Sequence, residues 1–260
     1  MSVIYKKLFL VFLLFSFLPS LLLAKENSVQ QDEFSDYLDT ASYQDGVFVN
    51  KDEYENYNRR MFTVNEKLDH YFLEPLARNY RRVAGKHIIQ GVRNFGENLS
   101  QPVVFFNCLF QGRFTDAVHT FWRFTINTTY GIGGLFDISS QFGVPDIDND
   151  FGLTLAYYGY DESNYFMIPL YKPSTIRDTL GFLVDLAMDP FNFLTPTLGL
   201  NNSVPLYVKS GVVVISKREQ VLDQTDKIYS VSLDKYAAIK SAYLQYRENQ
   251  VRQFLREEKE

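Results

Sequence analysis

The residue types that most often carry chemistry form no catalytic or metal-binding pattern in this sequence. The three histidines, His70, His87 and His119, lack the Glu-x-x-His or Cys-x-x-Cys neighbours that supply metal ligands at a fixed spacing. No Gly-x-Ser-x-Gly segment is present, so the nucleophile turn of a serine hydrolase has no support. Carboxylates are numerous, but no pair stands out as an acid and a base. We therefore expect no enzyme activity, no metal and no cofactor.

A glycine-rich segment, Gly131-Ile132-Gly133-Gly134, is the next candidate for chemistry. It lacks the third glycine of a dinucleotide-binding loop, because Phe136 stands at that position, and it lacks the Lys-Ser/Thr of a phosphate-binding loop. Two interpretations stay open. The segment is either a tight connection between helices that needs positive φ angles, or a flexible hairpin whose movement gates a path.

Charged and amide side chains interrupt two otherwise apolar helical segments. Arg123 and Asn127 lie in the first, and Arg177, Asp178 and Asp185 lie in the second. Burying a charge without a partner is costly. These side chains must therefore form ion pairs, reach solvent along their aliphatic stems, or line a wet path. For each one alone, the local pattern favours an ion pair or a solvent-facing position.

Apolar residues at intervals of three and four predict the helices that position these side chains. The predicted helices cover 57–73, 76–83, 88–99, 102–110, 115–129, 175–188, 206–225 and 233–257, and two short aromatic runs at 151–160 and 165–170 are strands or irregular segments. Glu74-Pro75 is expected to separate the first two helices, and Ser100 and Pro102 are expected to begin the fourth. The fold is therefore predicted to be mainly α.

The segment 102–110 is the least polar of these helices. It reads Pro-Val-Val-Phe-Phe-Asn-Cys-Leu-Phe, so a helix here needs apolar cover all round or lies against lipid. The residues expected to contact a membrane are Val103, Val104, Phe105, Phe106, Leu109 and Phe110. Aromatic residues make up 16% of the chain, which suits a surface at the lipid interface but also a tightly packed core.

The N-terminus, 1–24, has the pattern of a secretory signal. Two lysines precede an apolar run that ends at Ala24, the expected cleavage site. An uncleaved membrane anchor is the alternative, because about 17 apolar residues lie at the lower limit for spanning a bilayer. Residues 25–55, with nine acidic and two basic side chains, are expected to form an acidic flexible arm, and 56–258 a single helical domain.

Charge and cysteine content exclude two further classes. The formal net charge is −5, with no block of like charge that would bind a phosphate backbone, so nucleic acid is not an expected partner. Cys108 is the only cysteine, so no disulfide can form within the chain. An exported protein of this kind must be held together by burial or by a membrane.

Several short motifs keep a fixed order between residues 54 and 250. They are Asn56-Tyr57-Asn58-Arg59-Arg60-Met61-Phe62, Val92-Arg93-Asn94-Phe95, Leu109-Phe110-Gln111-Gly112, Arg123-Phe124, Gly133-Gly134-Leu135 with Asp137, Ser174-Thr175-Ile176-Arg177-Asp178, and Tyr243 with Gln245 and Arg247. Each is short, but together they resemble the MlaA (VacJ) family of outer-membrane phospholipid-trafficking proteins.

The resemblance implies a ring-like assembly of amphipathic helices that lies in one leaflet of the outer membrane, around a central amphiphilic channel. The implied function is to remove phospholipids from the outer leaflet, which maintains lipid asymmetry, and to pass them to a periplasmic lipid carrier. A trimeric outer-membrane porin is the other implied partner. The candidates for a polar channel lining are Arg123, Asn127, Arg177 and Asp178. The resemblance also favours the gating interpretation of the hairpin, with Gly131, Gly133, Gly134, Leu135 and Asp137 as its candidate residues.

One feature departs from the family. Its members typically carry an acylated cysteine directly after the signal, whereas this chain has Lys25 there. Attachment to the periplasmic face of the outer membrane is therefore expected to come from the apolar helices, from a porin or from an uncleaved signal. Two other functions stay open, namely an exported lipid hydrolase and a porin-associated structural protein that does not transport lipid.

Overall fold

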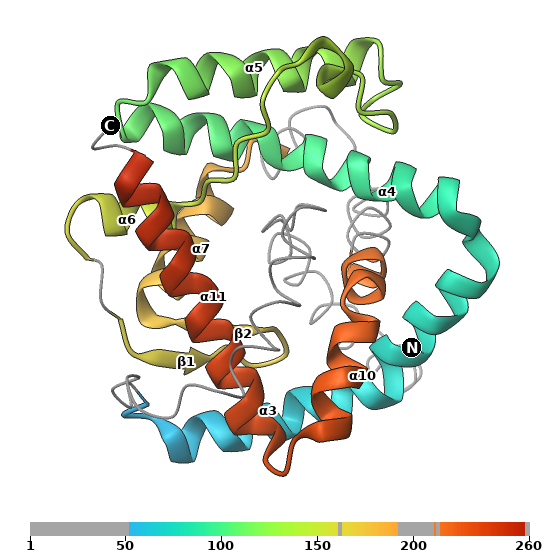
Figure 1. Cartoon of the computed structure of the whole chain (residues 1–260), viewed down its shortest axis with the longest axis vertical. Helices are drawn as coiled ribbons and strands as arrows, with labels where there is room; N and C mark the ends of the chain where they lie inside the picture. The colour runs from blue at the N-terminus through green and yellow to red at the C-terminus, as the bar shows by residue number, and fades with distance from the viewer. Residues whose placement is uncertain (1–51, 161–162, 192–210, 212–213, 258–260) are drawn as a thin grey trace, which may run out of the picture. The chain divides into compact units, whose positions relative to one another are not determined.

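The computed structural model describes residues 52–160, 163–191, 211 and 214–257 (Figure 1). The signal sequence, most of the acidic arm and part of the predicted helix 206–225 lie outside these residues. The described residues are mainly helical, which confirms the predicted fold class. They fall into two compact units, the first containing Leu76–Asp148 and Asp185–Gln220, and the second containing Lys25–Pro75, Asn149–Val184 and Val221–Glu260. The predicted single domain, ring and channel concern how these units combine, and they stay predictions.

The secondary structure is a succession of helices with one small hairpin. The elements are α3 (Glu55–Leu68), the π-helix η2 (Asp69–Leu73), α4 (Glu74–Phe110), α5 (Phe114–Thr129), the 3₁₀ helix η3 (Ser139–Phe142), α6 (Phe151–Tyr157), β1 (Tyr165–Met167), β2 (Pro173–Thr175), α7 (Ile176–Met188), α10 (Leu222–Val231) and α11 (Lys235–Glu257). Among the described helices, none combines the length and the apolar character needed to cross a bilayer.

The helices α4 and α5 lie side by side in the first unit (Figure 1). Val104 and Cys108 of α4 pack on Ala117 of α5, and all three are buried. The chain turns between the two helices at Gly112, where φ is 74°, in the left-handed region that favours glycine. Small and β-branched residues at the contact therefore allow the two helices to approach closely.

Within α4, the helix continues past a predicted boundary and bends at a residue that the periodicity did not mark. At Gly85 the backbone leaves helical geometry, with φ 65° and ψ 157°, so the helix bends there. At the predicted start of a new helix, Ser100 donates to the Glu97 carbonyl at 2.7 Å instead of capping, and Pro102 lies inside the helix. Packing of the following turns against α5 outweighs the hydrogen bond that a proline removes.

In the second unit, two asparagines of α3 hold the β-hairpin. Asn58 accepts from the Met167 N–H at 2.8 Å and donates to the Tyr165 carbonyl at 3.2 Å. Two turns further along the helix, Asn65 accepts from the Leu170 N–H at 2.7 Å. These amides satisfy backbone groups that a third strand would otherwise pair.

A short helix, α6, packs against α11 in the same unit. Asp150 caps α6 by accepting from the Leu153 N–H at 2.8 Å. Leu153 and Ala156 then bury against Val251 and Phe254 of α11. The aromatic run that begins at residue 151, for which a strand or an irregular segment was predicted, is therefore helical over its first seven residues, because the cap and the contact with α11 stabilise a helix too short to form alone.

Candidate functional site

Arg123 lies in the interior of the first unit, on the buried face of α5. Its guanidinium donates to the Asp137 carboxylate at 3.1 Å, to the Ser140 hydroxyl at 3.1 Å and to the Val144 carbonyl at 2.9 Å. Asp146 is a second carboxylate, with Oδ1 3.2 Å from Nε. Only 4% of Arg123 is exposed. The ion pair that the local pattern favoured for this residue is therefore confirmed.

Asn127 lies one helical turn further along α5 and holds the same loop. Its amide donates to Asp137 at 3.0 Å and accepts from the Ser139 N–H at 2.9 Å. Burial alone would raise the pKa of Asp137, but hydrogen bonds from Ser140 and Ser139 and the charge of Arg123 hold that pKa below its usual value. Asp137 is therefore an ionised acceptor that ties α5 to the segment after the glycines.

The glycine segment forms a tight hairpin between α5 and Asp137. Gly133 and Gly134 have φ angles of 71° and 99°, which side chains with a Cβ rarely adopt. Gly131 is required for a different reason, because a Cβ there would lie 2.2 Å from the carbonyl oxygen of Phe136. The interpretation that the turn needs positive φ angles is confirmed, and the gating interpretation stays a prediction.

Two asparagines of α4 anchor this hairpin. Asn98 donates to the Thr128 hydroxyl at 2.9 Å, and Asn94 donates to the Leu135 carbonyl at 3.1 Å. Between these anchors Ile132 is exposed and has a φ of 53°, which is uncommon for a β-branched residue. The hairpin therefore combines fixed ends with a strained apolar tip.

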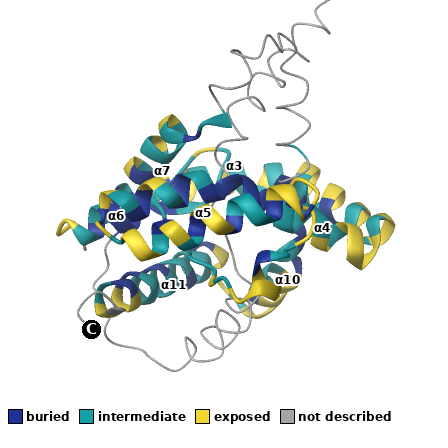
Figure 2. Ribbon diagram, turned by 90° about the horizontal axis from the view of Figure 1, so that it is seen from above, coloured by how far each residue is buried: buried dark blue, intermediate teal, exposed yellow. Residues whose placement is uncertain are grey.

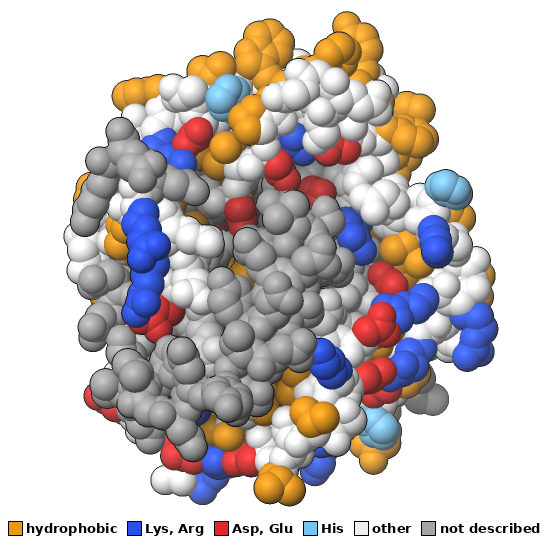
Figure 3. Space-filling view, in the orientation of Figure 1, with side chains coloured by type: hydrophobic (Ala, Val, Ile, Leu, Met, Phe, Trp, Pro, Cys, Tyr) orange, Lys and Arg blue, Asp and Glu red, His pale blue; other side chains and the backbone are white. Residues whose placement is uncertain are grey.

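The outward face of α5 carries no charge. From residue 102 to 130 the charged side chains are Arg113, Asp116 and Arg123; the first two pair with each other at 2.6 Å, and the third is buried. The exposed apolar side chains around this face are Phe106, Phe110, Phe114, Val118, Phe121 and Trp122. Figure 2 shows exposed residues along α5, and Figure 3 shows hydrophobic side chains projecting where Figure 1 places that helix.

The residues predicted to contact a membrane divide into two sets. Phe106 and Phe110 are 38% and 47% exposed, whereas Val103 and Val104 are 8% and 3% exposed. The prediction is wrong for the two valines, because they are buried within the first unit. The other two residues are half-buried. The segment is apolar all round because one side belongs to the core and the opposite side faces outward.

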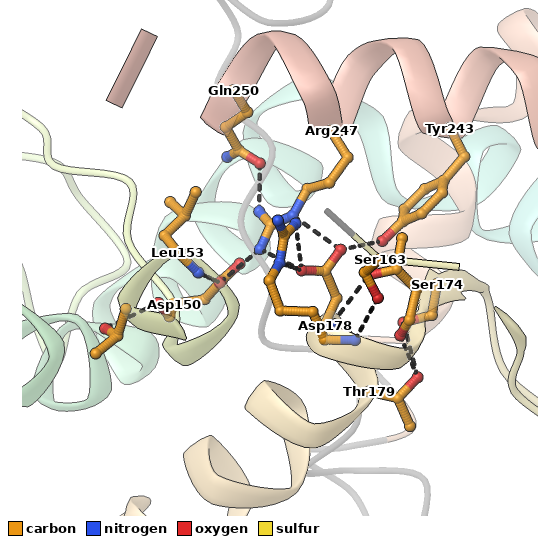
Figure 4. Close-up of polar contacts among 12 residues, drawn as sticks. Asp150, Leu153, Ser163, Ser174, Asp178, Thr179, Tyr243, Arg247 and Gln250 are labelled. Carbon is orange, nitrogen blue, oxygen red and sulfur yellow. Dashed lines mark hydrogen bonds and ion pairs between the residues drawn. The ribbon is translucent and has the colours of Figure 1, made fainter. Parts of the chain in front are cut away.

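Arg177 and Asp178, at the start of α7, belong to a second buried cluster in the second unit (Figure 4). Asp178 lies 2.8 Å from the Arg177 guanidinium and 3.0 Å from that of Arg247, which also pairs with Asp150 at 2.7 Å. The Tyr243 hydroxyl donates to Asp178 at 2.8 Å. Burial alone would raise the pKa of Asp178, but the charges of Arg247 and Arg177 hold it below its usual value.

The sequence-based candidates did not include Arg247 and Tyr243, which contribute as much to this cluster as the residues that were predicted. One signal was present, because a spacing of four places the two on one face of a helix. A second signal is Gly152, where a Cβ would lie 2.6 Å from atoms of both Arg247 and Asp178. The glycine therefore lets α6 approach the ion pairs.

Neither cluster is arranged for metal binding or proton transfer. In the parts of the chain that the structure describes, no group of three or more His, Cys, Asp or Glu side chains is close enough to hold a metal ion. Asp137 and Asp178 are both held ionised by cations and hydrogen-bond donors. A carboxylate stabilised in this way is a weak base and does not supply a proton near neutral pH.

Two features define the class to which the protein belongs: charges paired in the interior, and an uncharged apolar face outside. This arrangement is typical of helical proteins that work against an apolar phase or an apolar partner. The chain belongs to the MlaA lipoprotein family, whose model matches residues 50–250.

Individual relatives agree with this assignment. The chain is 34% identical over 202 residues to the intermembrane phospholipid transport system lipoprotein MlaA of Haemophilus influenzae, with 76% of this chain and 78% of the relative covered. It is 36% identical over 204 residues to an uncharacterised protein of Rickettsia typhi, covering 77% and 78%. A solved structure from work on the structural basis for maintenance of bacterial outer membrane lipid asymmetry is similar, with a TM-score of 0.62, 31% identity, and coverage of 77% of this chain and 98% of that chain.

The family is described as lipoprotein, which bears on the only cysteine of this sequence. Cys108 is fully buried in α4, against Val104 and Ala117. An acyl chain on its thiol would displace these contacts. Attachment through elements other than an acylated cysteine therefore stays a prediction.

Proposed function

We propose that this protein is the outer-membrane component of a phospholipid transport pathway that maintains lipid asymmetry. It accepts phospholipids from the outer leaflet and passes them to a periplasmic lipid carrier protein. Membership of the MlaA family supports this function, as do the name of the Haemophilus influenzae relative and the subject of the similar solved structure.

The uncharged face of α4 and α5 is the observation that carries the proposal. Its six apolar side chains, from Phe106 to Trp122, are between 38% and 68% exposed. Removing a fully exposed large apolar side chain from water gains about 1.5–3 kcal/mol, so six half-exposed ones gain on the order of 6 kcal/mol. A single myristoyl chain binds a membrane with a constant of about 10⁴ M⁻¹, which is roughly 5.5 kcal/mol. The face therefore supplies as much membrane affinity as one acyl chain, which suits a protein seated in the inner leaflet of the outer membrane.

The polar residues predicted to line the lipid path have a different immediate role. Arg123, Asn127, Arg177 and Asp178 are each engaged in a buried cluster, so a lipid headgroup would have to exchange with an existing partner. We assign them a supporting role in transport. They hold charges paired beneath an apolar surface and fix the helices that border the path.

The hairpin from Gly131 to Asp137 is our candidate for the gate. Its ends are held through Asp137 to α5 and through the Leu135 carbonyl to α4. Because its exposed tip is apolar, movement of the hairpin changes the apolar surface next to α5 without exposing a charge. Passage of lipid would then depend on how readily these two anchors release.

A trimeric outer-membrane porin and the periplasmic carrier are the protein partners that we propose. The second unit supplies an apolar surface suited to a porin or to lipid, because Leu180 and Leu183 of α7 are 48% and 53% exposed. An exported lipid hydrolase and a porin-associated protein without transport activity are the alternative functions.

Transfer of labelled lipid tests the proposal. Vesicles containing a phospholipid labelled in one acyl chain are mixed with the purified protein and with the lipid-free carrier, and the carrier is then separated and its lipid analysed. Intact labelled phospholipid on the carrier, above the level without the protein, supports a conduit. Released labelled fatty acid indicates a hydrolase. Transfer equal to that of the protein-free control contradicts the proposal.

A further inference from the structure

A group of polar atoms in the first unit lacks the partners that buried polar atoms normally have. They are the Tyr80 hydroxyl, the Arg93 Nε, the Ser216 hydroxyl and the Glu219 Oε2, and none of them finds a hydrogen-bond partner among the described residues. Ser216 is only 2% exposed and Glu219 only 6%. An unpaired buried polar group costs about 1–3 kcal/mol, so four in one place call for a physical reason.

The bend in α4 brings these groups together (Figure 1). Tyr80 and Arg93 are 13 residues apart, which in a straight helix corresponds to about 20 Å. Gly85 breaks the helix between them, and the segment 216–219 lies against both. Burial raises the pKa of Tyr80; Ser216 and Arg93 act to lower it, and Glu219 acts to raise it, as expected if all three surround the Tyr80 hydroxyl.

The charges of this group are not balanced. Arg81 neutralises Glu219, since its guanidinium donates to Oε1 at 2.7 Å and to the Glu219 backbone carbonyl at 2.8 Å. Within the described residues Arg93 has no carboxylate in an ion pair. The segment also contains Lys217 and Arg218, so positive charge is in excess. An anion is therefore the ligand class that the group favours.

The unpartnered atoms also differ in hydrogen-bonding type. Three are donors, from Arg93, Tyr80 and Ser216, and match the acceptor oxygens of a phosphate. The fourth, Glu219 Oε2, is an acceptor and matches a donor such as an ammonium group. Tyr80 and Arg93 are half-buried, so a ligand approaches from the α4 side. A phosphate joined to an ammonium by a short linker satisfies all four atoms.

The geometry points to a headgroup site formed by Tyr80, Arg93, Ser216 and Glu219, which binds the phosphate and ammonium of an ethanolamine-type phospholipid. This site rests on the proposed function and adds to it a preferred class of lipid. It lies apart from the Arg123 cluster, whose polar groups are already paired with one another. The phosphate is held by Arg93 and the two hydroxyls, and the ammonium by Glu219.

Binding of short-chain lipids to the purified full-length chain tests the site. Calorimetry compares dihexanoyl phosphatidylethanolamine, dihexanoyl phosphatidylglycerol and inorganic phosphate. We expect the ethanolamine lipid to bind most tightly and phosphate alone to displace it only at high concentration. Arg93→Gln should weaken binding of the ethanolamine lipid by at least about tenfold, as loss of a charge-assisted contact implies. Ser216→Ala should weaken it less, and Arg82→Gln, at an exposed arginine of the same helix, should not change it.

Because Arg93 has no ion pair to lose, the thermal midpoint of Arg93→Gln should equal that of the unmodified protein, which separates a binding residue from a structural one. Equal affinity of Arg93→Gln and the unmodified chain overturns the site. Equal affinity for the ethanolamine and glycerol lipids overturns the assignment of Glu219 to an ammonium, and tight binding of inorganic phosphate indicates a free-phosphate site instead. If the unmodified chain restores lipid asymmetry to deletion cells and Arg93→Gln does so equally, the headgroup site fails while the transport function stands.

Discussion

Replacing Arg123 by methionine tests whether the buried cluster of the first unit holds the structure together. The substitution keeps the length of the side chain but removes the hydrogen bonds to Asp137, Ser140 and Val144. Breaking a buried ion pair by removing one partner costs about 3–5 kcal/mol. The Asp137 and Asp146 side chains are 31% and 26% exposed and can be partly rehydrated, so we expect a loss near the lower end, about 3 kcal/mol.

Thermal unfolding of the purified protein in mild detergent, followed by circular dichroism, measures this loss. A decrease of about 3 kcal/mol corresponds to roughly 6–12 °C in the midpoint for a chain of this size. The control is Arg252→Met, because Arg252 is 63% exposed and pairs only with Glu248 one turn away, a contact worth about 0.3–0.5 kcal/mol. A midpoint for Arg123→Met within 2 °C of this control, by the same scaling, would refute the role that we give to the cluster.

Three further predictions concern the hairpin, the pH dependence and the apolar face. Gly131→Ala should destabilise the protein more than Gly133→Ala in the same thermal assay, because a Cβ at residue 131 meets a backbone oxygen at 2.2 Å and one at residue 133 meets nothing within 4 Å; equal losses would contradict the geometry. The pKa of Asp137 lies below its value in the unfolded chain, about 3.9, so its pairing stabilises the fold above that pH and is lost as the pH falls further. Asp137→Asn should therefore be less stable than the unmodified protein at pH 7, by a margin that shrinks below pH 4, and a constant margin would count against the ion pair. The double substitution Phe121→Asp and Trp122→Asp should release the protein from the outer-membrane fraction in a high-salt wash, whereas Val231→Asp, at an exposed valine of the second unit, should not; retention of both variants would argue against the face as an attachment site.

The helices could be predicted where the apolar periodicity and the local signals agree. The helices beginning near Thr115 and Leu233 are examples, because their apolar stripes bury against neighbours that any helical fold would supply. The exceptions come from long-range contacts. Gly85 bends a helix without any change of periodicity, and Pro102 is tolerated inside α4 because the following turns are held by α5.

The site could be predicted in part, because residue type reveals that a buried charge needs a partner but not which partner it finds. Arg123, Arg177 and Asp178 stood out as charges in apolar segments, and all three form ion pairs. Arg247 was missed since its helix is polar enough to look solvent-exposed, and its partners come from α6 and α7. Val103 and Val104 were assigned to the membrane because an apolar sequence does not distinguish a core from a lipid contact.

The most direct test of the central claim is the amount of phospholipid in the outer leaflet of the outer membrane in cells that lack this protein. The amount is measured as the phospholipid of intact cells that an added, non-penetrating phospholipase can digest. We predict that deletion raises this amount, that the unmodified chain restores it, and that a chain lacking Gly133-Gly134 folds but fails to restore it. An unchanged amount in the deletion cells, with the protein present in the outer membrane of the parent, would contradict the account.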